Sequence, residues 1–376
     1  MANIQILDNS TIHQLLINLS KEEAIGFRTI VEQTFEDFSI GNERQYQPMP
    51  STVQRENGQH TLFRPFTSDD SVGTKITVEP APKPDGSRDL LHGVIVLCDG
   101  TGNPTGLLGG EEVTGYRTSM NAMVPFSWRR NVEKILIFGT GVQAIWHTRL
   151  ILTLRGTEVK SITYVNPGRK NDVDRVIAKV SSENSTLWKS SCTFHGIYDH
   201  PTSSTYQQKI TASLTDGDCI FCTTPSKTPL FAAEHLIHRR EQGRQPFVCA
   251  IGSWQPEMIE VDPSVLYSAI AAPNAYNPMT GESRGVVLVD DRDFGLEHCG
   301  ELVKSKVGAG DIVELGEIIA LRKAKAKQNL LNTEHVREVD EFISEGFVVY
   351  KSVGVSLTDL TVSNAILGLS RRQHRL

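Results

Sequence analysis

A chain of 376 residues has enough material for two domains with separate hydrophobic cores, because single domains usually hold about 100 to 200 residues. Charged residues make up 22% of it and hydrophobic residues 39%, a balance that excludes a disordered or low-complexity protein. The net charge of −6 and the even spread of the 38 basic residues argue against a nucleic-acid or anionic-membrane partner, and no apolar run approaches the roughly 20 residues that span a bilayer.

The N-terminal part of the chain predicts a helix followed by strands. Residues 11–38 predict one long helix, and residues 60–66, 72–80 and 91–100 have the composition of short strands. A helix followed by a strand meander is typical of an α+β domain. We therefore expect an α+β domain over the first 130 residues.

From residue 131 the pattern changes to strands that alternate with helices. Apolar strand-like runs lie at residues 134–139, 161–166, 191–196, 218–222, 246–252 and 285–290. Helical segments separate the first of them, at 142–156 and 172–184. This alternation predicts an α/β domain with a doubly wound parallel sheet and right-handed crossovers. Residues 347–370 then predict a strand, a glycine turn and a final helix.

A glycine-rich turn follows the first strand of the alternating part. The stretch "FGTGVQA" has a strand before it, a long helix after it, and a second strand that ends about 20 residues further on. Gly139 permits the tight turn, Gly141 lets the backbone approach a pyrophosphate, and Ala144 is small enough for close packing of the helix on the strand. The helix N-terminus, at Val142 and Gln143, supplies a partial positive charge that holds phosphate. The pattern predicts a dinucleotide site.

The end of the second strand indicates which nucleotide binds. An NAD site usually places an acidic residue there against the ribose 2′-hydroxyl, but this chain has Asn166, followed by Arg169 and Lys170. Without carboxylate repulsion and with two cations nearby, a 2′-phosphate becomes acceptable. We therefore expect NADPH/NADP+ as the cofactor, with NAD(H) as the alternative.

Seven stretches, taken together, resemble the ornithine cyclodeaminase/mu-crystallin family in their order and spacing, and the resemblance covers nearly the whole chain. They lie at residues 72–78, 113–120, 138–144, 217–226, 250–266, 286–292 and 350–360. The resemblance implies a substrate-binding and dimerisation domain over 1–130, to which 345–376 return, and a Rossmann nucleotide-binding domain over 131–344. It also implies a homodimer with an active site in the cleft between these domains.

The resemblance assigns roles to three basic residues. Lys75, in "GTKI", matches the active-site lysine of the family, and Arg117, in "GYRTS", matches an arginine at the junction of cofactor and substrate. Arg55, in "TVQRENG", matches a second carboxylate-binding arginine. An arginine fork can hold a carboxylate by two hydrogen bonds, while a lysine in a closed site can orient the substrate or move a proton. Taken without the family, each would more often be an exposed surface charge.

The resemblance also implies further contacts with the cofactor. Thr118 and Ser352 match positions on the nicotinamide side. Two loops after later strands add Thr223, Thr224, Pro225, Ser226, Gly252 and Ser253. Turn formation is the alternative role for these small residues.

Two positions depart from the family pattern. Trp254 stands near the place of an aspartate that serves ring closure in the cyclodeaminase branch, and an indole cannot act as a base at neutral pH. This departure argues against ornithine cyclodeamination but leaves hydride transfer intact, because that step belongs to the cofactor. Arg64 stands where many relatives have a methionine, and it would favour a second substrate carboxylate if its side chain faces the active site. Strand alternation leaves open which way it faces.

Together these features predict an NADPH-dependent oxidoreductase that reduces a C=N bond adjacent to a carboxylate. The substrate would be a ketimine, a cyclic imino acid, or the imine of a keto acid and an amine, and the reverse reaction would be that of an amino-acid dehydrogenase. Lys75 and Arg117 would be catalytic, with Arg55, Arg64 and Trp254 also against the substrate. Two alternatives stay open: a cyclodeaminase-type lyase that releases ammonia from ornithine or lysine, and an NADPH-dependent small-ligand-binding protein like mu-crystallin.

The remaining residues predict no metal site and an intracellular location. The six cysteines lie mostly in apolar runs and are expected to be buried free thiols, while His235 and His238 lack companion ligands. The start of the chain lacks a basic segment followed by an apolar one, so we expect a cytoplasmic protein. The final tripeptide, His374-Arg375-Leu376, loosely resembles a peroxisomal address and makes the peroxisome the alternative.

Overall fold

The protein divides into two compact α/β units in a computed structural model that describes residues 4–85, 89–237, 245–252, 256–272, 275–327 and 334–373. The first unit is Met1–Thr118 with Val355–Leu376, and the second is Ser119–Gly354. The division falls inside helix α3 (Gly110–Ser127), earlier than the boundary at 130/131 expected from sequence. None of the described helices is both long and apolar enough to cross a membrane.

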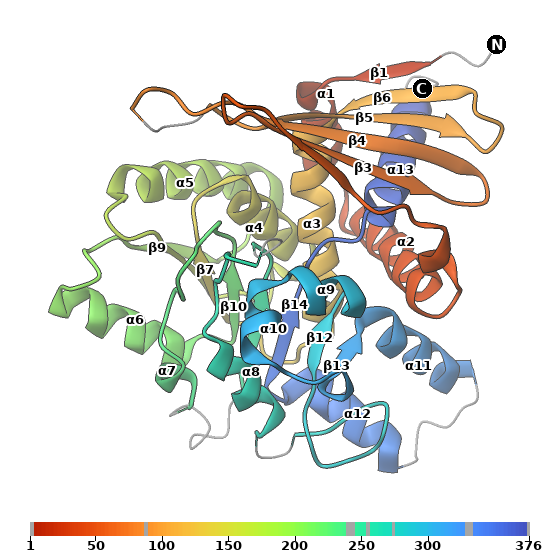
Figure 1. Ribbon diagram of the computed structural model, residues 1–376. Helices are drawn as coiled ribbons and strands as arrows, with labels where there is room; N and C mark the ends of the chain where they lie inside the picture. Colours follow the sequence, from red (N-terminus) through yellow and green to blue (C-terminus); the bar gives the residue numbers. More distant parts are fainter. Residues whose placement is uncertain are drawn as a thin grey trace. The chain divides into compact units, whose positions relative to one another are not determined.

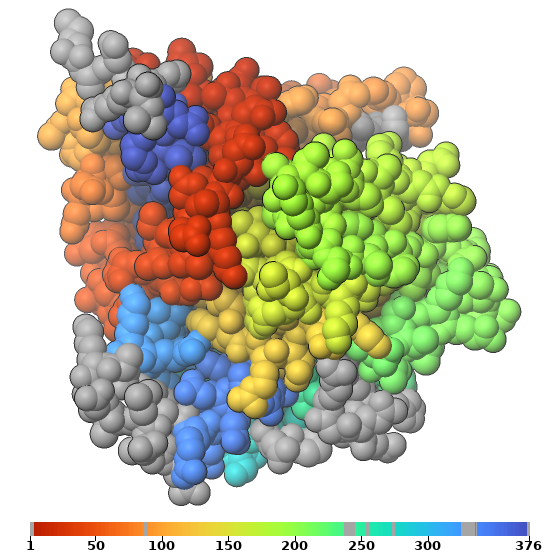
Figure 2. All heavy atoms as spheres, turned by 180° about the vertical axis from the view of Figure 1, so that it is seen from behind, coloured from red at the N-terminus to blue at the C-terminus, as the bar shows by residue number. Residues whose placement is uncertain are grey.

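The first unit is a sheet covered by helices. Its elements are β1 (Gln5–Leu7), α1 (Asn9–Ile17), α2 (Lys21–Ser39), η1 (Glu43–Tyr46), β2 (Ser51–Gln54), β3 (His60–Thr67), β4 (Ser71–Glu79), β5 (His92–Asp99), β6 (Pro104–Gly109), the start of α3, and α13 (Leu357–Gln373). The six strands run in the order β1-β6-β5-β4-β3-β2, and only the β1–β6 pair is parallel. Figure 1 shows α13 and α2 on one side of these strands. Figure 2 shows the blue surface of α13 beside the red surface of the first helices, which it contacts.

The first helical segment is divided, so the expectation of one helix over 11–38 was wrong. Ser20 caps α2: its hydroxyl accepts a hydrogen bond from the backbone N–H of Glu23 at 3.2 Å, and the Glu23 carboxylate accepts one from the backbone N–H of Ser20 at 2.9 Å. This reciprocal pair is a capping box, which starts a new helix by satisfying N–H groups that have no partner within it. The chain can therefore turn between α1 and α2.

Strand alternation gives the sheet of the first unit two distinct faces. The inner face, under α13, carries buried apolar side chains, among them Phe66, Ile95 and Leu108. At Gly106 a Cβ atom would lie 2.6 Å from the side chain of Leu367 in α13, so the glycine lets this leucine lie against the strand. The inner face is thus a core, and it also carries Lys75.

The second unit is built on an eight-stranded sheet in the order β13-β12-β14-β11-β10-β7-β8-β9, in which all neighbours are parallel. Its elements are the end of α3, β7 (Lys134–Phe138), α4 (Val142–Arg155), β8 (Ser161–Val165), α5 (Lys170–Glu183), η2 (Asn184–Trp188), β9 (Thr193–Ile197), α6 (Ser204–Asp216), β10 (Cys219–Cys222), α7 (Glu234–Ile237), β11 (Phe247–Ala250), α8 (Pro263–Ile270), β12 (Val287–Val289), α9 (Arg292–His298), α10 (Gly300–Ser305), η4 (Ala309–Asp311), β13 (Ile312–Glu314), α11 (Leu315–Lys327), α12 (Glu334–Glu345) and β14 (Val348–Lys351).

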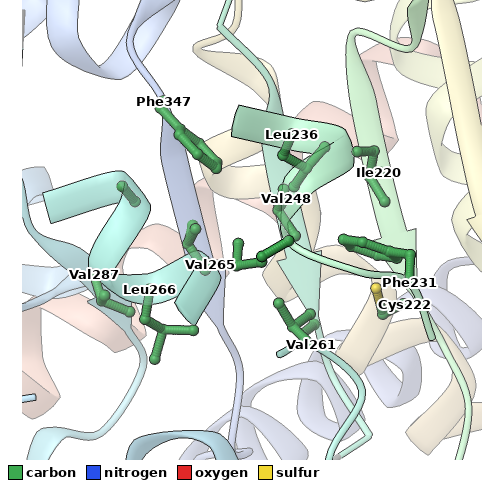
Figure 3. Packing of buried hydrophobic residues seen from close by; sticks show 14 of the residues in the cluster. Ile220, Cys222, Phe231, Leu236, Val248, Val261, Val265, Leu266, Val287 and Phe347 are labelled. Atoms are coloured by element: carbon green, nitrogen blue, oxygen red, sulfur yellow. The ribbon is translucent and has the colours of Figure 1, made fainter. Parts of the chain in front are cut away.

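Helices cover both faces of this parallel sheet. On one face, strand residues such as Ile220 and Val248 pack with Leu236 of α7 and Val265 of α8, as Figure 3 shows. On the other face, Phe221 meets Phe126 of α3 and His147 of α4, with ring centroids 5.7 and 5.2 Å apart. Apolar burial on both sides is what a doubly wound sheet requires, so the predicted fold class is confirmed.

Candidate functional site

The strand order of the second unit changes direction between β7 and β10. From β7 the chain adds β8 and β9 on one side and then β10 and β11 on the other. In open α/β sheets ligands bind beyond the carboxyl ends of the strands at such a switch point. Thr223, which follows β10, donates hydrogen bonds from its backbone N–H and its hydroxyl to the carbonyl of Phe138, at 3.0 and 2.7 Å, which places it beside the end of β7.

The glycine turn after β7 has the geometry that a pyrophosphate site needs. Gly139 has a φ of +108°, in the left-handed region, and a Cβ atom there would lie 2.8 Å from the hydroxyl of Thr223. Gly141 is the N-cap of α4, and no described atom lies within 4 Å of a Cβ built on it. Ala144 is buried where α4 meets the sheet, whereas Val142 is exposed. The start of α4, where a helix carries partial positive charge, therefore has room beside it for a phosphate.

The polar residues after β8 differ in whether their side chains already have hydrogen-bond or ion-pair partners. The Asn166 amide donates to the hydroxyl of Thr140 at 2.7 Å, which ties this strand end to the glycine turn. Lys170 forms an ion pair with Asp174 and lies 5.1 Å from the centre of the Tyr198 ring. Arg169 is exposed, and among the described residues its guanidinium has no ion-pair or hydrogen-bond partner. Of the two cations, Arg169 is the one available to an anion.

The later loops that are predicted to contact the cofactor directly follow strands of this sheet. The backbone N–H groups of Thr224 and Gly252, after β10 and β11, both donate to the carboxylate of Glu260. The Ser226 hydroxyl donates to the carbonyl of Thr228 at 2.6 Å, so it stabilises its own turn, and Pro225 is exposed. Ser253 and Trp254 lie outside the described residues.

Two further predicted positions have partners inside the second unit. The Ser352 hydroxyl donates to Asp290 at 2.7 Å, and the same buried carboxylate accepts from the backbone N–H groups of Val353 and Gly354. Asp290 therefore fixes the loop after β14. The side-chain oxygen of Gln143 accepts from the hydroxyl of Ser119 at 3.2 Å. Together with the turn at Gly139, these contacts fit a nicotinamide dinucleotide at the switch point.

A buried charge cluster lies in the first unit. Lys75 of β4 donates to both carboxylate oxygens of Asp359 in α13, at 2.9 and 3.0 Å, and the Nε of Arg117 in α3 donates to the same carboxylate at 3.0 Å. Lys75 is 3% exposed, Arg117 4% and Asp359 0%. The structure thus brings together the two residues predicted to be catalytic, through an aspartate that the sequence analysis did not single out.

The cluster changes the protonation of its members. Burial lowers the pKa of the Lys75 ammonium from 10.5 to about 7, and the charges of Arg117 and Arg64 act in the same direction while Asp359 opposes them. Burial alone would raise the pKa of Asp359, but Arg117 and Lys75 outweigh it and hold that pKa below its usual value. At neutral pH, Lys75 can therefore give up or take a proton while Asp359 remains a carboxylate.

The guanidinium of Arg117 is only partly satisfied within the cluster. Its Nε is bound to Asp359, but its buried Nη1 has no hydrogen-bond partner in the part of the chain that the structure describes. A buried donor without an acceptor costs about 1 to 3 kcal/mol, and more when it is charged. An anionic ligand that supplied the acceptor would recover this cost.

The sheet register settles the orientation of Arg64. Arg64 of β3 is paired directly with Lys75 of β4, and paired residues of neighbouring strands point to the same face with Cβ atoms about 5 Å apart. Arg64 is therefore on the inner face, where its charge also lowers the pKa of Asp359. The cluster then holds three basic residues around one carboxylate.

Other predicted residues of the first unit do not join this cluster. Arg55 follows β2 in the hairpin before β3, where its side chain is exposed, and the structure shows no contact between it and Lys75 or Arg117 among the described residues. Thr118 is buried on α3, next to Arg117 in the chain. Asp359 had one signal in the sequence: it is an acidic residue within the final apolar helix.

Comparisons with known proteins cover nearly the whole length of the chain. No protein-family model matches it. It is 28% identical over 361 residues to a Delta(1)-pyrroline-2-carboxylate reductase of Bacillus cereus, with 93% of this chain and 91% of the relative covered. It is 23% identical over 372 residues to an uncharacterized cyclodeaminase of Dictyostelium discoideum, with 93% and 92% covered.

A solved structure shares the fold. The structure of Thermococcus litoralis Delta(1)-pyrroline-2-carboxylate reductase in complex with NADH and L-proline matches with a TM-score of 0.67 over 99% of this chain and 98% of that chain, at 16% identity. At this identity the match establishes the two-part fold.

Proposed function

We propose that this chain, which belongs to the ornithine cyclodeaminase/mu-crystallin family, is a nicotinamide-nucleotide-dependent enzyme that reduces a C=N bond adjacent to a carboxylate. The proposal uses both units: the first would hold the imino acid, and the second would hold the nucleotide. Its relatives include reductases of pyrroline-2-carboxylate, a cyclic imino acid.

Arg117 is the proposed carboxylate-binding residue. Asp359 fixes its Nε, which aims the rest of the planar guanidinium, and the buried Nη1 has no acceptor in the described chain. A substrate carboxylate would supply that acceptor in a charge-assisted hydrogen bond, which is shorter and stronger than a neutral one. This donor, beside a lysine that titrates near neutrality, is the observation that carries the proposal.

Lys75 is the proposed proton donor. When bound, the nucleotide supplies a hydride to the imine carbon, and reduction is completed when the imine nitrogen receives a proton. Both protonation states of Lys75 are accessible near neutral pH, because burial lowers its pKa to about 7. Its ammonium is held in place by both oxygens of Asp359, so the proton is positioned before it is transferred.

The test is NADPH oxidation by the purified protein with a panel of cyclic imino acids. We expect turnover in the wild type and, in Arg117→Lys, a rise in KM of roughly 10- to 100-fold, because a lysine keeps the charge but cannot make the fork. Arg149→Lys is the matched control, since Arg149 is a buried arginine paired with Glu183 in the second unit. Equal kinetics in Arg117→Lys and the wild type would refute the assigned role.

A second substrate carboxylate is part of the proposal. Arg64 and Lys75 are directly paired and share the inner face, so Arg64 adds a further positive charge to the cluster of Lys75, Arg117 and Asp359. Substrates with two carboxylates should be preferred over those with one. Arg64→Met should remove this preference while retaining turnover of the monocarboxylate; an unchanged ratio of kcat/KM values would contradict it.

NADPH is the proposed nucleotide. Asn166 in place of an acidic residue, and an exposed Arg169 without a partner in the described chain, support a 2′-phosphate after β8. A cytoplasmic location belongs to the proposal as well. It is supported by six free cysteines, five of them buried, since disulfides are rare in that compartment.

A homodimer is proposed from the outer face of the first sheet. The register places the following apolar side chains on the face opposite α13: Ile6, Val53, Phe63, Val72, Ile76, Val94, Val96 and Leu107. Ile6 is 74% exposed and Val53 43%, and no Lys, Arg, Asp or Glu points outward from these strands at the paired positions described. An uncharged apolar face is complementary to itself, as a two-fold dimer requires.

A further inference from the structure

A fully buried carboxylate joins the two loops that follow β10 and β11. One oxygen of Glu260 accepts a hydrogen bond from the backbone N–H of Thr224 at 2.6 Å, and the other accepts from the backbone N–H of Gly252 at 2.6 Å. The Thr224 hydroxyl adds a third bond at 3.2 Å. Glu260 is 0% exposed, so these bonds replace hydration that the carboxylate has lost.

The two loops touch each other at this carboxylate. A Cβ atom at Gly252 would lie 2.0 Å from the carbonyl oxygen of Thr224 and 2.8 Å from the carboxyl carbon of Glu260. No side chain fits there, so the glycine permits the close approach and the carboxylate fixes its distance. The distance between the ends of β10 and β11 therefore depends on the side chain of Glu260.

Glu260 also contacts two other charged residues of the second unit, Glu301 and Lys351. The Glu301 carboxylate of α10 accepts from the backbone N–H of Glu260 at 2.7 Å. The Nζ of Lys351, at the end of β14, lies 3.8 Å from Glu260 and 3.6 Å from Glu301. A lysine between two buried carboxylates compensates their charge, which makes the group rigid.

We propose that Glu260 is a positioning residue that sets the separation of the Thr224 and Gly252 loops and thereby the affinity for the nucleotide. The inference rests on the proposed function, since it takes these loops as part of a nucleotide site. Glu260 would act through the two backbone N–H groups and would not touch the reacting atoms.

The arrangement also makes nucleotide affinity depend on pH. Burial raises the pKa of Glu260 from 4.5 to about 7, against the opposing effects of Lys351 and of the two N–H donors. The other titratable groups around it are Glu301 of α10 and the thiols of Cys222 and Cys249 in β10 and β11. A protonated carboxyl cannot accept equally at both oxygens, so affinity should fall as the pH drops below about 7.

The experiment measures the dissociation constant of NADPH by fluorescence titration in the full-length wild type and in Glu260→Gln. The side-chain amide of glutamine has one oxygen that can accept a hydrogen bond and one NH2 group that cannot. One of the two backbone N–H groups would therefore lose its acceptor, and we expect the Kd to rise roughly 10- to 100-fold. At saturating nucleotide we expect kcat to change by less than about threefold. The Kd for NADH, which carries no titrating 2′-phosphate, should lose its pH dependence in Glu260→Gln. Glu183→Gln, which breaks the half-buried ion pair with Arg149, is the control and should leave Kd unchanged.

Two results with the variants would overturn the inference: an unchanged Kd in a folded Glu260→Gln, or an equal rise in Kd in Glu183→Gln. If Glu260→Gln does not fold, the wild type is titrated with NADH instead, because the 2′-phosphate of NADPH itself titrates near pH 6. In that experiment, a Kd for NADH that stays constant between about pH 6 and pH 8 would overturn the inference. A wild type that binds neither nucleotide would instead refute the proposed function.

Discussion

The pKa of Lys75 lies near neutral pH because burial lowers it by more than the partner carboxylate of Asp359 raises it. A surface lysine would hold its proton up to about pH 10, and one paired only with Asp359 would hold it higher still. Arg117 and Arg64 lower this pKa further, and they are also the residues proposed to bind substrate carboxylates. In the proposed reaction, the residues that would bind the substrate thus also lower the pKa of the proposed proton donor.

The first prediction concerns the pH dependence of reduction. Because the protonated form of Lys75 is the one that donates, kcat/KM for the imino acid should fall as the pH rises through about 7. Lys75→Met should lose this limb and at least about 100-fold in rate. Lys179→Met, at an exposed lysine of α5, serves as the control. A profile that is flat through neutrality in the wild type would contradict the assignment.

The second prediction separates the two cations after β8. Arg169→Ser should raise the KM for NADPH roughly 10- to 100-fold, because a charge-assisted hydrogen bond to the 2′-phosphate is lost, while the KM for NADH stays the same. Lys170→Ser should have little effect, since its ammonium is engaged by Asp174 and Tyr198. Steady-state kinetics with both nucleotides measures this, and equal or better turnover with NADH in the wild type would remove NADPH as the cofactor.

The sequence could predict residues of the site only where a local motif carries them. "GTKI" and "GYRTS" indicated Lys75 and Arg117, and both are buried together. Asp359 lies 284 positions from Lys75, so no local pattern could have paired them. The orientation of Arg64 required the register of β3 against β4, which alternation within one strand cannot supply.

At the scale of elements, the break between α1 and α2 shows how a cap can override helical periodicity. The hydrogen bonds between Ser20 and Glu23 satisfy two N–H groups at the start of α2. Because these groups need no partner in a preceding turn of helix, α1 can end at Ile17 at little cost in free energy. The four residues "SKEE" contained this signal, but apolar spacing on both sides of it favoured one continuous helix. Strands with strong apolar runs, such as β7 and β10, were predicted because burial on both faces leaves a continuous pattern.

The third prediction tests this cap. Ser20→Ala should lower the free energy of unfolding by about 0.5 to 2 kcal/mol, since the N–H of Glu23 loses its acceptor. Urea denaturation followed by circular dichroism measures the change, and the KM values should remain unaltered. Ser10→Ala, at an exposed serine in the first turn of α1, is the control. Equal stability of the two variants would mean that the cap does not set the break.

At the scale of the whole molecule, the first unit presents an apolar sheet face that its own helices leave uncovered. The helices α1 and α13 contact the strands and α2 packs on α13. On the opposite face, apolar side chains alternate with a few Ser, Thr and His, and the paired positions described carry no Lys, Arg, Asp or Glu. The alternation of strands and helices was sufficient to predict the doubly wound second unit. It could not predict the order of the first sheet, because β1 joins β6 across about a hundred residues of chain and only tertiary contacts decide that pairing.

The fourth prediction concerns this face. Leu107→Asp places a charge among the outward apolar residues of β1, β6 and β5 and should convert a dimer into a monomer, as measured by light scattering after size-exclusion chromatography. Leu90→Asp, at a leucine that is 80% exposed outside the strands, should leave the dimer intact. A wild type that elutes as a monomer, or a Leu107→Asp variant that remains a dimer, would contradict the proposed interface.

The stoichiometry of the reaction tests the central claim most directly. The purified protein is incubated with NADPH and Delta(1)-pyrroline-2-carboxylate, and separately with ornithine, while nucleotide absorbance, proline and ammonia are measured together. We expect one proline to be formed from the imino acid for each NADPH consumed. Ammonia released from ornithine without net change in NADPH would contradict it and indicate a cyclodeaminase, and tight ligand binding without turnover across the imine panel would indicate a binding protein instead.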